Sequence, residues 1–91
     1  MRRYVIERAI PGLGGSSAAE LQAISQKSCG VLEQLGTDVQ WEHSYVTPDT
    51  LYCVYLAENE ELVREHAARG GFPIDRVSQV QAVIDPTTAQ A

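Results

Sequence analysis

The chain has 91 residues and a formal net charge of −5, with seven lysines and arginines against twelve aspartates and glutamates. A chain of this length forms one domain with a modest core, and such domains often gain further burial from a partner chain. The basic residues are spread along the sequence. This distribution excludes nucleic acid as a partner, because its phosphates are held by clustered lysine and arginine. The acidic balance favours a cation or a neutral small molecule.

No apolar run approaches the roughly 18 residues that a membrane span requires, so we expect no membrane partner. Arg2 and Arg3 precede a strand-like segment, residues 4–7, and not the apolar core of a signal peptide. These features predict a cytoplasmic protein. Cys29 and Cys53 lack a CxxC spacing, and we expect both to stay reduced there.

The first part of the chain predicts a strand followed by a helix. Residues 2–9 alternate as a strand. One side of that strand carries Tyr4, Ile6 and Arg8. Ser17 and Glu20 have the spacing of a capping box, which predicts that a helix begins there, and Gly36 is a C-terminal stop.

A β-hairpin is predicted next. Residues 39–47 and residues 51–57 both have strand character, and the turn signal at 48–50 lies between them. Two strands with so short a connection predict an antiparallel pair. Strict alternation assigns one face of the first of these strands to Val39, Trp41, His43 and Tyr45.

The last third of the chain predicts a second helix, a fourth strand and a tail. Asn59 can cap a helix that runs to Arg69 before a pair of glycines. Residues 74–84 predict the fourth strand, and its part 76–81 is polar enough to lie at a sheet edge. Residues 86–91 predict a frayed C-terminal tail.

The order of these elements predicts a fold class. Strand, helix, strand, strand, helix, strand is the split βαβ, ferredoxin-like α+β arrangement, with two helices on one face of a four-stranded antiparallel sheet. Residues 1–85 would form this single domain. The other face of the sheet would carry aromatic side chains. A patch of that kind is usually covered, so we expect a sheet-to-sheet homodimer.

The ligand-type side chains around the second helix suggest a metal site. Spacing of three and four residues puts His66 on the apolar face of that helix. A borderline metal such as nickel, copper or zinc could be bound by His66, Cys53, Glu65 and His43. No standard ligand spacing is present. The structural alternatives are a core histidine bonded to its surroundings for His66 and an exposed strand residue for His43.

Other functions stay open on these residues. His66 could be the general base of a small enzyme, of isomerase or monooxygenase type, with a pocket between sheet and helices. It could also activate Cys53 as a nucleophile. The glycine loop at 12–17 could hold an anion, although a flexible turn is the simpler interpretation. An interaction module without chemistry is the remaining possibility.

The chain also resembles a known family across residues 3–88. The segments that carry the resemblance are 4–8, 11–12, 41–46, 52–55, 64–67, 70–73 and 83–87. The family comprises small bacterial proteins, long catalogued as a domain of unknown function, with a member described as nickel-binding and nickel-responsive. The resemblance implies a ferredoxin-like homodimer that binds nickel near its surface and sequesters it. His66 lies in a segment shared with the family, whereas a site that used His43 would be particular to this chain.

Overall fold

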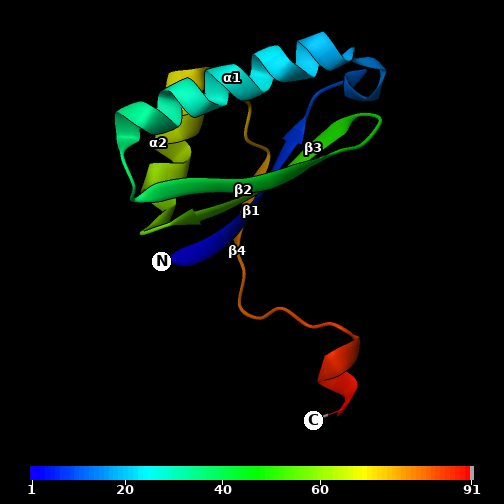
Figure 1. The fold of residues 1–91 in the computed structure, drawn as a ribbon, viewed down its shortest axis with the longest axis vertical. Helices are drawn as coiled ribbons and strands as arrows, with labels where there is room; N and C mark the ends of the chain where they lie inside the picture. The colour runs from blue at the N-terminus through cyan, green and yellow to red at the C-terminus, as the bar shows by residue number, and fades with distance from the viewer. Residues whose placement is uncertain (91) are drawn as a thin grey trace.

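The structure is a computed structural model that describes residues 1–90. Its elements are β1 (Arg2–Ala9), η1 (Leu13–Gly15), α1 (Ala18–Leu35), β2 (Val39–Val46), β3 (Thr50–Ala57), α2 (Glu60–Gly70), β4 (Arg76–Gln79) and η2 (Pro86–Gln90). The four strands form one antiparallel sheet in the order β2-β3-β1-β4. Both helices lie over the same face of this sheet (Figure 1). The predicted α+β class and element order are confirmed.

The helix boundaries follow from capping groups that the sequence carries. The Ser17 hydroxyl accepts from the Glu20 amide at 3.1 Å, and the Glu20 carboxylate accepts from the Ser17 amide at 3.1 Å. This is the predicted capping box, and it satisfies two N–H groups that the helix itself leaves free. The Asn59 side chain accepts from the Leu62 amide at 3.0 Å and begins α2. Gly71, at φ 68°, ends α2 in the left-handed conformation that glycine adopts without strain.

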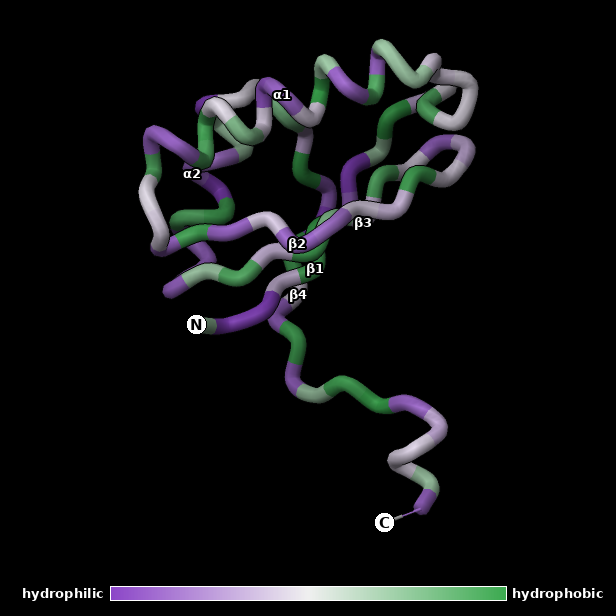
Figure 2. The backbone as a smooth tube through the Cα atoms, viewed as in Figure 1, coloured by the Kyte–Doolittle hydropathy of each residue, from purple (hydrophilic) through white to green (hydrophobic). Residues whose placement is uncertain are grey.

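The core lies between the helices and the covered face of the sheet. Its buried members are Tyr4, Ile6, Val39, Cys53, Tyr55, Ala57 and Val63. Residues paired across antiparallel strands share a face, so β1 and β3 together supply the floor of this core. Figure 2 shows the apolar residues concentrated along these central strands.

The predicted alternation assigns the side chains of the second strand to the wrong faces of the sheet after Trp41. The pairing of β2 with β3 shifts between Trp41 and His43, so that Trp41 opposes Tyr55 and His43 opposes Val54. Glu42 is the extra residue of a β-bulge, and a bulge reverses the alternation that follows it. Trp41 therefore faces the helices, whereas His43 turns to the uncovered face.

The fourth strand is shorter than the predicted 74–84. β4 spans only Arg76–Gln79 at the edge of the sheet, where β1 is its one neighbour. Its last backbone bond joins the Val80 amide to the Arg3 carbonyl at 2.8 Å. β1 itself begins at Arg2, so the chain beyond Val80 has no strand to pair with. The following segment leads away from the body (Figures 1 and 2) and leaves Ile84 78% exposed.

No helix within residues 1–90 combines the length and the apolar character needed to cross a membrane.

Candidate functional site

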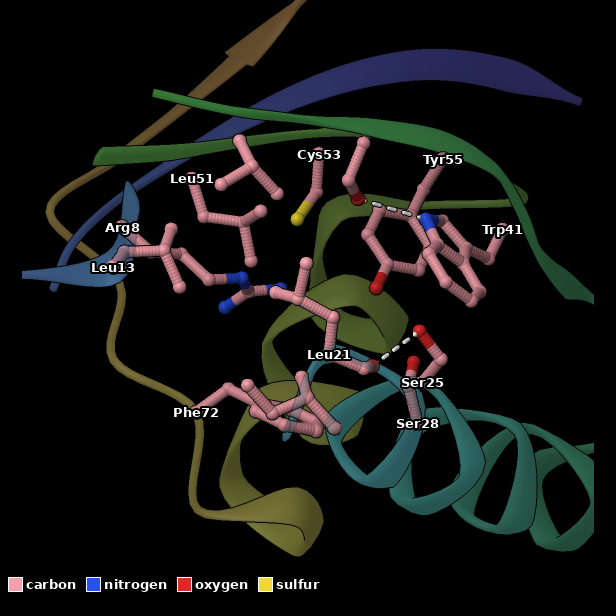
Figure 3. Close-up of a pocket in the computed structure, with 13 residues that line it drawn as sticks. Arg8, Leu13, Leu21, Ser25, Ser28, Trp41, Leu51, Cys53, Tyr55 and Phe72 are labelled. Atoms are coloured by element: carbon pink, nitrogen blue, oxygen red, sulfur yellow. Dashed lines mark hydrogen bonds between the residues drawn. The ribbon is translucent and has the colours of Figure 1, made fainter. Parts of the chain in front are cut away.

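A cavity of about 130 Å³ lies between α1 and the covered face of the sheet, near the end where β2 turns into β3. Its apolar walls are formed by Leu13, Leu21, Ile24, Trp41, Val46, Leu51 and Phe72. Its polar groups belong to Arg8, Ser25, Ser28, Ser44, Cys53 and Tyr55. These side chains come from every layer of the fold, and Figure 3 shows how they surround a common space. We call this space the α1 cavity.

Arg8 is the charged group of the α1 cavity. It lies on the same side of β1 as Tyr4 and Ile6, as the alternation predicts, and it is only 2% exposed. Its Nη1 donates to the Pro73 carbonyl at 2.8 Å, and the guanidinium carbon lies 5.5 Å from the centre of the Phe72 ring. Its Nη2 is buried without a hydrogen-bond partner in the described chain. Sequence reasoning missed this group, although an arginine on an otherwise apolar strand face was its signal.

His66 lies behind the wall of the α1 cavity and is 0% exposed. Its Nε2 is 3.0 Å from the Ser28 hydroxyl, and its ring packs against Tyr55 and Phe72 at centre distances of 5.1 and 5.5 Å. Burial lowers the pKa of His66 from its usual 6.5 to about 4, and the positive charge of Arg8 acts in the same direction. The ring is therefore neutral at neutral pH. It can act on a molecule in the cavity only through Ser28.

Cys53 and Tyr55 are neighbours on the inward face of β3. The Cys53 thiol points toward the α1 cavity (Figure 3), and the residue is 3% exposed. Burial raises the pKa of Tyr55, although the nearby Ser28 hydroxyl opposes this effect. Cys53 and His66 thus lie on the same side of the sheet, but only the thiol reaches the cavity.

The other two predicted metal ligands lie elsewhere. Glu65 is on the exposed side of α2, where its carboxylate accepts from Arg69 at 2.6 Å. His43 is exposed on the uncovered face of the sheet, with its ring 5.0 Å from that of Tyr45. Within residues 1–90, no three His, Cys, Asp or Glu side chains gather closely enough to hold one ion. The predicted ligand set is therefore divided among three places in one chain.

The Glu42 carboxylate, next to His43 in the sequence, already forms an ion pair. Arg3 donates to both oxygens of Glu42, at 3.1 and 2.9 Å. This paired bond lowers the pKa of Glu42 and raises the pKa of Arg3. Glu42 is thus held as a carboxylate on the surface beside the bulge.

The glycine loop at 12–17 packs against the β2–β3 turn. The Gly14 amide donates to the Pro48 carbonyl at 2.9 Å, and the Gly12 amide donates to the Asp49 carboxylate at 3.0 Å. A Cβ on Gly14 would lie 2.8 Å from the Pro48 Cα, so this contact requires glycine. Two of the amides that could have held an anion are used within the chain, which agrees with the simpler interpretation of this loop.

The fold and the site define a small α+β protein with two helices over one face of an antiparallel sheet and a cavity between the layers. Residues 4–80 match the model of the SCO4226-like family, described as nickel responsive protein SCO4226-like. The chain belongs to this family.

A solved structure with a similar fold was found. The crystal structure of SCO4226 from Streptomyces coelicolor A3(2) is similar to this chain with a TM-score of 0.75 and 20% sequence identity. The similarity covers 90% of this chain and 99% of that one. No curated protein matches the sequence. The family and the fold agree with the resemblance that the sequence motifs carry.

Proposed function

We propose that this protein binds nickel as a homodimer that forms through the uncovered face of its sheet. The family supports the metal, because its members are described as nickel responsive. The structural support is the position of His43, an exposed imidazole on a sheet face that carries apolar side chains. Sequestration of nickel in the cytoplasm is the physiological form of this proposal.

The uncovered face has the composition of a contact surface. We call it the open face, and its strand residues include Val5, His43, Tyr45, Tyr52, Val54 and Leu56. Tyr45 is 59% exposed there, and no helix covers this side of the sheet (Figure 1). A second copy stacked on this face would remove Tyr45 and the partly buried Val5, Tyr52 and Leu56 from water. A two-fold axis would also bring the same residues of both copies to one interface.

A dimer can bring together metal-binding side chains that a single chain keeps apart. Imidazole nitrogen is a suitable donor for nickel, and affinity rises when several donors meet one ion. His43 of one copy would meet the open face of the second copy, so two imidazoles can serve one site, with water in the remaining positions. His66, Cys53 and Glu65 stay predicted ligands. Burial of the first two and the Arg69 contact of the third make them weaker choices than His43.

The test is a calorimetric titration of untagged protein with nickel. Wild type should bind with a measurable heat, and His43→Gln should weaken binding at least tenfold. His66→Gln, Cys53→Ser and Glu65→Gln should keep the wild-type affinity. Loss of affinity in His66→Gln or Cys53→Ser, with His43→Gln unchanged, would place the metal inside the fold. Absence of nickel binding by wild type would remove the proposed function.

The predicted alternative was a small enzyme with His66 as general base. The α1 cavity supplies a pocket for such a function, but the His66 ring does not line it. For that reason nickel binding is our conclusion.

A further inference from the structure

The α1 cavity contains a buried positive charge without a negative partner. Arg8 is 2% exposed, and no carboxylate within residues 1–90 forms an ion pair with it. Its contacts within the described chain are all with neutral groups: the Pro73 carbonyl, the face of the Phe72 ring and the Tyr55 hydroxyl, where Arg8 acts to lower the pKa of Tyr55 against the larger effect of burial. Burial of a charge is costly unless the charge is paired and hydrogen-bonded. The arrangement is therefore incomplete as a purely structural one.

Arg8 lines the α1 cavity and keeps one buried donor without a partner in the described chain. That donor is the guanidinium nitrogen Nη2. Figure 3 shows its guanidinium between Cys53 above and Phe72 below, in the middle of the lining side chains. The planar guanidinium pairs best with a carboxylate or a phosphate, which accepts charge-assisted hydrogen bonds from it.

The other residues that line the α1 cavity favour a ligand that is mostly apolar over a ligand that carries several charges. Most of its walls are hydrocarbon or aromatic, contributed by α1, β2, β3 and Phe72. A second donor is present, because the Ser44 hydroxyl accepts from Trp41 Nε1 at 2.9 Å and keeps its own proton to donate. Ser25 already donates to the Leu21 carbonyl at 2.9 Å, so its oxygen can accept. Few polar groups among apolar walls are typical of small-molecule sites.

The size of the cavity limits the occupant. Its volume is about 130 Å³. Apolar protein cavities of about 150 Å³ bind benzene, so an occupant with a body of that size is the upper limit here. A dinucleotide or a sugar phosphate is much too large.

We infer that the α1 cavity binds a small organic carboxylate, whose carboxyl group pairs with Arg8 and whose apolar body packs against Trp41 and Phe72. The site is on the helix-covered side of the sheet. It is independent of the proposed nickel site on the open face, and either can fail without the other.

Benzoate is the first probe, with benzamide as its neutral counterpart of nearly equal shape. Trp41 is the only tryptophan of the chain and lines the cavity, so its fluorescence reports occupancy. We expect a saturable change with benzoate and at least tenfold weaker binding of benzamide. Isobutyrate, whose apolar body is smaller than a benzene ring, should also cause a saturable change, and inorganic phosphate should cause no change, because it has no apolar body. Equal binding of benzoate and benzamide would overturn the inference, as would a lack of saturation with both acids. Tighter binding of phosphate would overturn the carboxylate assignment.

Two arginines of β1 give a matched pair of variants. Arg8→Gln removes the inward charge, and Arg3→Gln removes an arginine on the opposite side of β1, whose side chain is 40% exposed. We expect Arg8→Gln to weaken benzoate at least tenfold and to abolish its advantage over benzamide. Arg3→Gln should leave benzoate binding unchanged. Equal effects of the two variants would refute a specific role of Arg8.

Ser25→Leu provides a test that keeps Arg8 in place. The added side chain occupies part of the α1 cavity, because Ser25 lines it from α1. We expect loss of benzoate binding with a thermal transition close to that of wild type. Should Arg8→Gln fail to fold, this variant and the wild-type comparison of benzoate with benzamide decide the question. Unchanged benzoate affinity in Ser25→Leu would show that the acid binds elsewhere.

Discussion

The buried histidine predicts a pH dependence of stability that can be calculated from its environment. His66 is 0% exposed, and burial lowers its pKa from 6.5 to about 4. In the unfolded chain the imidazole takes up a proton as the pH falls through about 6.5. In the folded protein it resists protonation until about pH 4. Between these values the unfolded chain binds more protons, so acid favours unfolding.

The size of the effect follows from the separation of the two pKa values. His66 contributes its full share of stability above pH 6.5 and loses it progressively as the pH falls toward 4. The complete loss is on the order of 3 kcal/mol, and about 2 kcal/mol of it is lost by about pH 5. A loss of that size is a large part of the stability of a small domain, which is typically about 5–15 kcal/mol.

Urea unfolding at several pH values measures this contribution. The two histidines give a matched pair, because His66 is buried and His43 is exposed. Wild type and His43→Gln should both lose about 2 kcal/mol more than His66→Gln between about pH 7.5 and pH 5. The carboxylates are the same in wild type and His66→Gln and cancel in that comparison, whereas Glu42 lies next to His43 and its pKa responds to that residue. The reasoning fails if His66→Gln shows the same pH dependence as wild type.

Three further perturbations test the packing and the interface. Val5→Lys puts a charge in the middle of the open face and should convert a dimer to a monomer by sedimentation; a dimer of unchanged strength would place the interface elsewhere. Gly70→Ala should cost about 1–3 kcal/mol in urea unfolding, because its Cβ would lie 2.2 Å from the Phe72 ring; a neutral result would show that the ring moves freely. Cys29 is exposed and Cys53 is buried, so a thiol reagent should modify Cys29 first, and equal rates would contradict the burial of Cys53.

Local signals account for most of what the sequence predicts correctly about the fold. The capping box at Ser17, the Asn59 cap and Gly71 after α2 each act within one turn of helix. Alternation along β1 likewise depends only on strand geometry, and it places Arg8 beside Tyr4 and Ile6. Such features can be recognised without knowing what packs against them.

The wrong predictions depend on partners that are distant in the sequence. The bulge at Glu42 arises in the pairing of β2 with β3, and no glycine or proline marks it. The length of β4 is limited by where β1 begins, which is set at the other end of the chain. Composition within 39–47 or 74–84 therefore could not reveal either one.

In the candidate site, too, features set by the local sequence could be predicted, whereas features set by distant contacts could not. The inward position of His66 follows from helical spacing and is confirmed. Its bond to Ser28 and the separation of Glu65 from Cys53 depend on how α1 and α2 pack on the sheet. The lack of a carboxylate partner for Arg8 could be recognised only when the positions of all carboxylates in the described chain were known.

The stoichiometry of nickel binding tests the central proposal most directly. A site shared by two copies of His43 predicts one nickel ion for every two chains, bound by a dimer in calorimetry and in native mass spectrometry. His43→Gln should lose this species while keeping its fold. One tightly bound nickel for each single chain, retained in His43→Gln, would contradict a metal site on the open face.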